Sequence, residues 1–234
     1  MDPTDRNLSE TLLHQLKVIK GLKTKWTAAV SSTDKIFTSL TYNLMREQRI
    51  INSELRDRDA WSLKAVLDYP PASRALLQGD VQTAAKLVAA FLIESDFDRL
   101  ETLLNEASDY IADFQKSVSR LVAIQNRQLQ LNVSASSPLP ATGGRRCSDP
   151  AGVETQMHLI SWPAVVGEAK ALQARLLADL DFRRGLLRYI AKCVVDSQAR
   201  GDFDAPQRVC FLWRQALEAV MWEKFLELAN HLNS

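Results

Sequence analysis

The 234-residue chain has little of what enzymes and secreted domains usually carry, with three cysteines, three histidines and eight glycines. Cys147, Cys193 and Cys210 fit no zinc or redox spacing, and their odd number favours a reducing compartment. No apolar run approaches the roughly 20 residues that span a bilayer. The polar first residues predict no secretory signal. These features favour the cytoplasm and the nucleus.

Sequence motifs for catalysis and cofactor binding are also missing. There is no G-x-x-x-x-G-K-[ST] loop and no G-x-G-x-x-G turn for phosphates. His14, His158 and His231 lie far apart and form no H-E-x-x-H motif. Asp96 and Asp98 are two positions apart, so on a helix they point in different directions and do not converge on a metal ion. We therefore predict a protein that is not an enzyme, with no catalytic residue, no cofactor and no metal site.

The charge of the chain is balanced, with 29 lysines and arginines against 28 aspartates and glutamates and a formal net charge of +1. A strongly basic surface is the usual mark of a protein that binds nucleic acid or acidic membranes. The composition therefore predicts neither direct nucleic-acid binding nor membrane binding, and leaves other proteins as the expected partners.

The most informative segment runs from residue 81 to 131, which contains no glycine or proline. Its apolar residues recur every three or four positions, which is typical of an amphipathic helix. Those in the second half are Leu103, Ala107, Tyr110, Phe114, Val118 and Leu121. Such a helix would be on the order of 75 Å long. It needs another long helix beside it to cover its apolar face.

A second long helix is predicted from about Asn7 to residues 56–59, with the same three-and-four spacing of apolar residues. We expect the two helices to form an antiparallel hairpin. In that arrangement Phe37 and Leu40 lie near Leu100 and Leu103. A short insert at residues 59–79 separates the two helices.

Local signals divide the insert. Pro70 and Pro71 prevent the first short helix from continuing. Gly79 can close the next turn, and Asp80 can cap the long helix that begins at residue 81.

The remaining chain is predicted to hold a flexible linker and two helices. Residues 132–157 are rich in serine, proline and glycine, which is typical of a disordered linker, and Ser148 follows two arginines as in a kinase site. Ser161 and Pro163 predict the start of a helix that extends to Gly201. The last helix starts at residues 204–206 and extends to the end of the chain.

The predicted fold class is therefore all-α, an elongated helical bundle. The predicted organisation is a hairpin at 1–131 with the insert at 59–79, a linker at 132–157, and a C-terminal helical pair at 158–234 that packs on the hairpin. Residues 94–113 are acidic, and an antiparallel hairpin would set them beside the lysines of the first helix. The alternative is that both charged stretches are solvated faces.

Aromatic residues are the candidates for partner binding, because tryptophan is favoured in interface hot spots. Trp26 is in phase with the leucines of its helix and is predicted to be core. The last helix is apolar on nearly all sides, so we expect one of its tryptophans to face a partner. The candidates are Trp61, Trp162, Trp213, Trp222 and Phe225.

Four motifs occur in an order that is similar to one family. They are W-x-x-A-V-x-x-x-x-x-I-F-x-S-L-x-x-N-L from Trp26, L-x-x-x-L-D-Y-P-P from Leu63, D-R-L-E-x-L-L from Asp98, and L-x-x-D-L-x-x-R-x-x-L-L ending at Leu187. The chain resembles the AIRIM family, small helical ribosome-maturation factors that accompany a pair of AAA+ ATPases. The layout covers most of residues 10–230, although residues 132–160 look longer than the family's linker.

This resemblance implies a non-catalytic adaptor subunit of a hetero-oligomeric AAA+ complex. Such a complex acts on precursors of the large ribosomal subunit and is linked to the turnover of replication proteins. The implied partners are the ATPases and a CINP-like helical subunit, with the pre-ribosomal particle reached indirectly. Trp162-Pro163 is also similar to CINP itself. A further alternative is an independent coiled-coil scaffold or tether, since long apolar repeats suit that class equally well.

Overall fold

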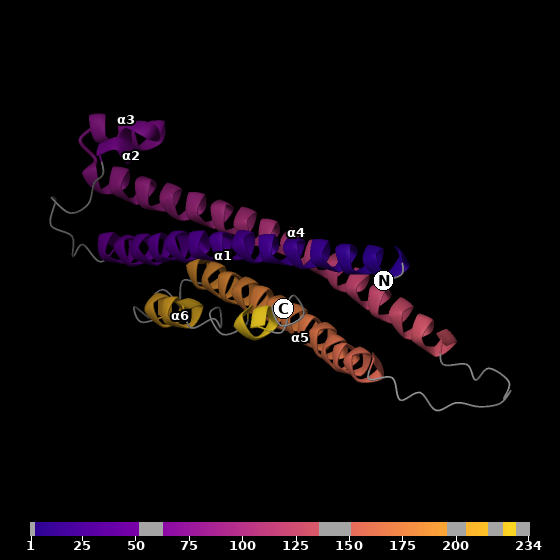
Figure 1. Ribbon diagram of the computed structural model, residues 1–234. Coiled ribbons are helices and arrows are strands. Elements are labelled where there is room, and N and C mark those ends of the chain that lie inside the picture. Colours follow the sequence, from indigo (N-terminus) through magenta and orange to yellow (C-terminus); the bar gives the residue numbers. More distant parts are fainter. Residues whose placement is uncertain (1–2, 52–62, 136–150, 196–204, 215–221, 228–234) are drawn as a thin grey trace, which may run out of the picture. The chain divides into compact units, whose positions relative to one another are not determined.

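The computed structural model describes residues 3–51, 63–135, 151–195, 205–214 and 222–227, and all its regular structure is helical. Figure 1 shows the labelled helices, with colours that follow the sequence. Their bounds are α1 Pro3–Ile51, α2 Leu63–Asp68, α3 Pro70–Leu77, α4 Val81–Ala135, α5 Ala151–Val195 and α6 Ala205–Arg214. Residues 222–227 form a further short helical segment. The predicted all-α class is confirmed.

The two long helices of the predicted hairpin are present. α4 has 55 residues and starts at Val81, where the absence of glycine and proline predicted it to start. α1 has 49 residues and begins at Pro3, before the predicted start near Asn7. Its predicted end at 56–59 lies outside the described residues.

The C-terminal half differs from the prediction in two ways. α4 continues to Ala135 and α5 begins at Ala151, so both ends of the predicted linker 132–157 are helical. Pro163 lies inside α5 and does not start it. A proline removes one backbone hydrogen bond from a helix, but a helix of 45 residues keeps the bonds on both sides. Ser148 and the middle of the linker lie outside the described residues.

The last predicted helix is described in two parts, α6 and residues 222–227. The chain between them and after them lies outside the described residues, and so does the predicted stretch from Asp196 to Gly201. Contacts between residues divide the chain into two compact units. Unit 1 contains residues 1–27, 109–178 and 217–234, and unit 2 contains residues 28–108 and 179–216. Each unit therefore combines parts of the predicted hairpin with parts of the C-terminal region.

In unit 2 the hairpin is antiparallel and a buried polar pair lies between its helices. The side-chain amide of Asn43 in α1 donates to Asp96 Oδ2 in α4 at 3.0 Å, and both residues are buried. Nearer the insert, Ile50 of α1 packs against Ala85 and Ala89 of α4. Going from Asn43 to Ile50 along α1, the partners in α4 move back from Asp96 to Ala89 and Ala85, so the two helices run in opposite directions. Phe37 and Leu40 of α1 and Leu100 of α4 are all fully buried.

A buried arginine joins α5 to α1 and α6 in unit 2. Arg183 of α5 is 2% exposed and donates to Asp34 Oδ1 of α1 at 3.1 Å and to Asp179 Oδ2 of its own helix at 3.0 Å. Its guanidinium lies 5.1 Å from the ring centroid of Trp213 in α6. Trp213 also stacks on Phe37 of α1, with ring centroids 4.0 Å apart. α6 therefore packs against both α1 and α5 through Trp213.

The insert forms α2 and α3, which pack on the first turns of α4 (Figure 1). Val66 and Ala72 meet Val88 of α4, and Tyr69 stacks on Phe91 with ring centroids 4.7 Å apart. The double proline occupies the first turn of α3, where no backbone donor is needed.

The junction between α3 and α4 follows the predicted chemistry. Gly79 has φ +80°, a conformation that a side chain would disfavour. Asp80 Oδ1 then accepts from the backbone N–H of Thr83 at 3.0 Å and caps α4.

Unit 1 brings residues 222–227 against the long helices. Trp222 meets Phe114 of α4 edge to face, with ring centroids 5.8 Å apart. Glu168 of α5 is buried and pairs with Lys224 at 3.2 Å and with Arg175 at 3.2 Å. Lys25 of α1 lies 5.8 Å from the ring centroid of Tyr110. This contact sets Lys25, one of the lysines of the first helix, beside the acidic stretch 94–113 of α4.

We predict that Asn43 and Asp96 act as one unit in setting stability. Asn43→Leu removes the amide donor from a buried carboxylate and should lower the free energy of unfolding by about 2–3 kcal/mol. Adding Asp96→Leu should recover most of that loss, because no buried charge then remains. Urea unfolding followed by circular dichroism measures both variants. Additive losses in the double variant would contradict the pairing.

We also predict that Asp80 stabilises the protein in a pH-dependent way. The hydrogen bond from the backbone of Thr83 holds the pKa of Asp80 below its ordinary value. This contribution is therefore complete above the unfolded-state pKa and is lost as the pH falls through the folded-state pKa. Asp80→Asn keeps a cap that does not titrate. The difference in thermal midpoint between the two proteins should thus be constant above pH of about 5 and shift in favour of the variant at lower pH.

Candidate partner-binding groove

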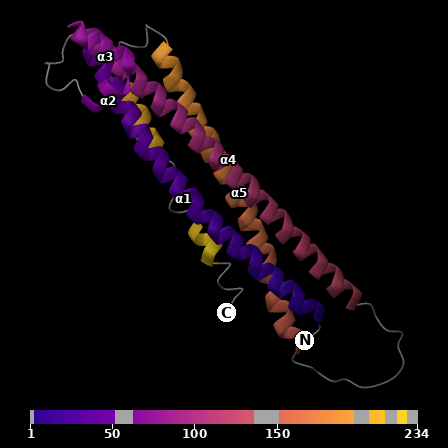
Figure 2. The ribbon, with the colours of Figure 1, turned by 90° about the horizontal axis from the view of Figure 1, so that it is seen from above.

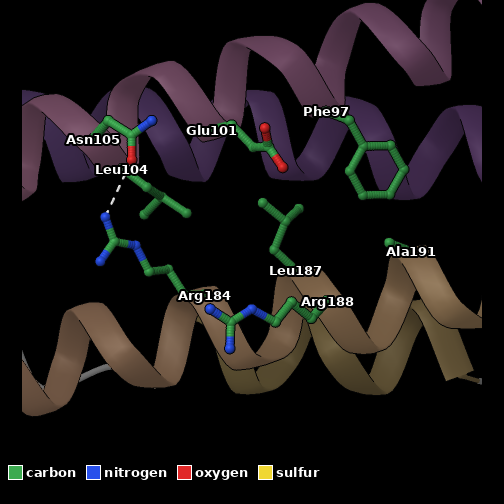
Figure 3. Close-up of a pocket in the computed structure, with 8 residues that line it drawn as sticks. All are labelled: Phe97, Glu101, Leu104, Asn105, Arg184, Leu187, Arg188 and Ala191. Atoms are coloured by element: carbon green, nitrogen blue, oxygen red, sulfur yellow. Dashed lines mark hydrogen bonds between the residues drawn. The ribbon is translucent and has the colours of Figure 1, made fainter.

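A groove lies between α4 and α5 in unit 2, on the side where no helix of the described chain covers it. Figure 3 shows the groove with α4 along one wall and α5 along the other. Its volume is about 370 Å³. Eight residues line it: Phe97, Glu101, Leu104 and Asn105 from α4, and Arg184, Leu187, Arg188 and Ala191 from α5.

Helical spacing produces the two walls. Phe97, Glu101 and Asn105 are four residues apart in α4, and Arg184 and Arg188 are four residues apart in α5, so each set lies on one face of its helix. Leu104 and Leu187 are buried and form the floor. Phe97 and Ala191 are half-buried at the same end of the groove (Figure 3).

The walls carry opposite charges. Glu101 lies on the α4 wall and Arg188 on the α5 wall, and both side chains are exposed. At one end Arg184 donates to Asn105 Oδ1 at 3.1 Å and bridges the helices (Figure 3). The ribbons of α4 and α5 are seen from another side in Figure 2. Within the described ranges no hydrogen bond or ion pair is recorded for Glu101 or Arg188. Glu101 thus lies on the side of α4 that faces α5.

The size and lining of the groove are those of a binding site. Its volume is at the low end of the roughly 300–1,000 Å³ of small-molecule pockets. An apolar floor between two charged walls is the form that receives one face of a protein segment.

The predicted anchors Trp213, Trp222 and Phe225 are all buried, at 0%, 3% and 0% exposure. Trp213 is covered by α1 and α5, and Trp222 by α4, so the chain itself supplies their contacts. Trp61 lies outside the described residues. Trp162 lies within α5, but its side chain is outside the described part of the structure. Of these candidates, the three whose side chains the structure describes, Trp213, Trp222 and Phe225, do not line the groove.

Two sequence features mark residues of the groove, although the sequence alone did not predict a groove. Glu101 and Leu104 belong to the D-R-L-E-x-L-L motif, and Arg184 and Arg188 have the spacing of neighbours on one helix face. A sequence does not specify which faces of two helices meet, so these residues could not be joined into one site before the fold was known.

Two further findings concern the described residues alone. They include no cluster of three or more histidine, cysteine, aspartate or glutamate side chains placed to hold a metal ion. No helix among them combines the length and apolar character that crossing a membrane requires.

Comparisons of the chain with protein-family models, with curated proteins and with solved structures find no match.

We predict that Trp213 contributes to stability through its stacked ring and not through its polar atom. Its indole Nε1 is buried without a hydrogen-bond partner in the described structure. Trp213→Ala should therefore lower the free energy of unfolding by about 3–5 kcal/mol. Trp213→Phe keeps a ring against Phe37 and removes the unpaired donor, so it should cost much less.

Urea unfolding measures these losses, and Phe211→Ala on the same helix is the matched control. Phe211 is 63% exposed, and its truncation should change stability by less than about 0.5 kcal/mol. Equal losses for Trp213→Phe and Trp213→Ala would contradict a role for the stacked ring.

Proposed function

We infer that the chain is a non-catalytic helical adaptor, a subunit of a hetero-oligomeric AAA+ ATPase complex that acts on precursors of the large ribosomal subunit. In this role the ATPases hydrolyse ATP, and the chain links them to a second small helical subunit and to the substrate. Work in the turnover of replication proteins, and a location in cytoplasm and nucleus, belong to the same proposal.

One observation of the structure supports a binding role: the open α4–α5 groove, with an apolar floor and charged walls. In the same unit α6 packs against α1 and α5, with Trp213 against Phe37 and Arg183. The corresponding position between α4 and α5 has no such cover from the described chain. Exposed concave surfaces of this kind are where helical subunits receive partner segments.

The link to AAA+ ATPases is supported by the order of the four motifs in the sequence. Two of them contribute to the groove and the packing of unit 2. D-R-L-E-x-L-L supplies Glu101 and Leu104 of the groove. L-x-x-D-L-x-x-R-x-x-L-L supplies Asp179 and Arg183, which hold α5 to α1. One of the two motifs thus supplies residues of the open groove, and the other supplies residues that pack α5 against α1.

The experiment is affinity purification of the full chain from cells, with quantitative mass spectrometry of the proteins recovered. We expect two AAA+ ATPases and one further small helical subunit in near-stoichiometric amounts. Depletion of the chain should make precursors of the large ribosomal subunit accumulate, because their assembly factors are not released.

Phe37→Asp is the control for folding, since it buries an unpaired charge at a fully buried position and should abolish recovery of every partner. Recovery of rod-like scaffold or tethering subunits without ATPases would overturn the proposal in favour of the alternative class.

A further inference from the structure

The α4–α5 groove has a division of charge that restricts what can occupy it. On α4 the exposed acids Glu94, Asp98 and Glu101 lie three or four residues apart, on the side of the helix that carries the groove wall. On α5 the wall residues Arg184 and Arg188 are both basic. Asp181 and Lys192 are exposed one turn beyond them on either side. One wall is therefore acidic and the other mainly basic.

These charges are available to a ligand, because the two walls do not neutralise each other. Arg184 is engaged by Asn105, which is uncharged. Glu101 and Arg188 are on opposite walls at the open part of the groove, and no ion pair joins them (Figure 3). Between them the floor is apolar, with Leu104 and Leu187.

The dimensions favour a helix over a small ligand. Both walls are helices, and a helix laid along them presents side chains at the same spacing of three and four residues. About 370 Å³ holds a few apolar side chains from such a helix, next to Phe97 and Ala191. A free anion would meet Glu101 opposite Arg188, and a free cation would meet Arg188 opposite Glu101, so a small ion of either sign is disfavoured.

We propose that this groove binds an amphipathic helix of a partner protein that carries basic residues on the flank facing α4 and acidic residues on the flank facing α5. The apolar face of the helix lies on the half-buried Phe97 and Ala191, above the buried Leu104 and Leu187. Turning such a helix end to end exchanges its flanks, so the charges also select one of its two directions along the groove. Opposite charges across an interface fix register and orientation more than they add affinity.

This inference rests on the proposed adaptor function only for the identity of the partner. It gives the chemistry of the partner's segment, whichever protein supplies it. Its test therefore uses synthetic peptides and not a purified complex.

The probe is a fluorescent helical peptide with an apolar stripe, lysines on one flank and glutamates on the other. The control peptide has the same composition with lysines and glutamates mixed on both flanks. A peptide with its flanks exchanged is not a suitable control, since reversing its direction restores the match. Binding to the full chain is measured by fluorescence anisotropy. We expect the sided peptide to bind at least about tenfold more tightly than the mixed one, which is about 1.4 kcal/mol.

Variants of the protein locate the binding. Glu101→Lys and Arg188→Glu should each weaken the sided peptide several-fold and leave the mixed peptide little changed. Glu106→Lys on α4 and Lys35→Glu on α1 are the matched controls, as both residues are exposed away from the groove lining. These controls should leave affinity for the sided peptide unchanged. Circular dichroism and urea unfolding check that all four variants fold, which is expected for exposed positions.

Three results would overturn the inference. The first is equal affinity for the sided and mixed peptides. The second is an equal change in affinity for the sided peptide in the groove variants and the control variants, which would mean that the peptide binds elsewhere. The third is self-association of the chain, measured by light scattering, that Glu101→Lys or Arg188→Glu disrupts, because a second copy then occupies the groove.

The proposed function can fail separately from this inference. If ATPases copurify with the chain and the groove variants leave their recovery unchanged while the peptides show no preference, the function stands and the groove assignment is wrong. If the peptides show the sided preference but no ATPase is recovered, the groove binds a helix and the partner is another protein.

Discussion

The buried guanidinium of Arg183 is the interaction on which the packing of unit 2 depends. A charge in the interior is costly unless it is paired and hydrogen-bonded. Arg183 meets that requirement with one carboxylate from α1 and one from its own helix, and with the face of Trp213 from α6. These partners come from three separate parts of the sequence. The geometry that satisfies the charge therefore also brings α1, α5 and α6 together.

This arrangement explains why one side of unit 2 is covered and another is open. Trp213 is held between Phe37 and Arg183, so α6 is held against α1 and α5. α4 contacts α5 through the Arg184–Asn105 bond and the apolar floor beside it. The outer edge of that contact carries exposed charges, which favour solvent or a complementary partner over further packing within the chain.

Much of the fold could be predicted because it follows local rules. The apolar spacing of residues 81–131 predicted α4, the Pro70–Pro71 pair predicted the break in the insert, and Gly79 with Asp80 predicted the junction. The start of α5 was predicted wrongly at Pro163, because a proline can begin a helix or lie inside one, and the residues near it do not distinguish these two positions. The candidate site was less predictable. Tryptophan is equally suited to a core and to an interface, so the sequence could not assign Trp213 or Trp222, and the structure buries both.

Two polar contacts attach α1 to different neighbours, Asp34 to Arg183 of α5 and Asn43 to Asp96 of α4. Each residue removed from or added to a helix rotates the turns beyond it by about 100°. A single insertion or deletion between positions 34 and 43 would therefore turn one of these side chains away from its partner and leave a buried charge unsatisfied. In connecting segments a change of length costs much less free energy. This stretch of α1 is thus a fixed spacer, and among natural variants of the chain its length should vary less than its sequence.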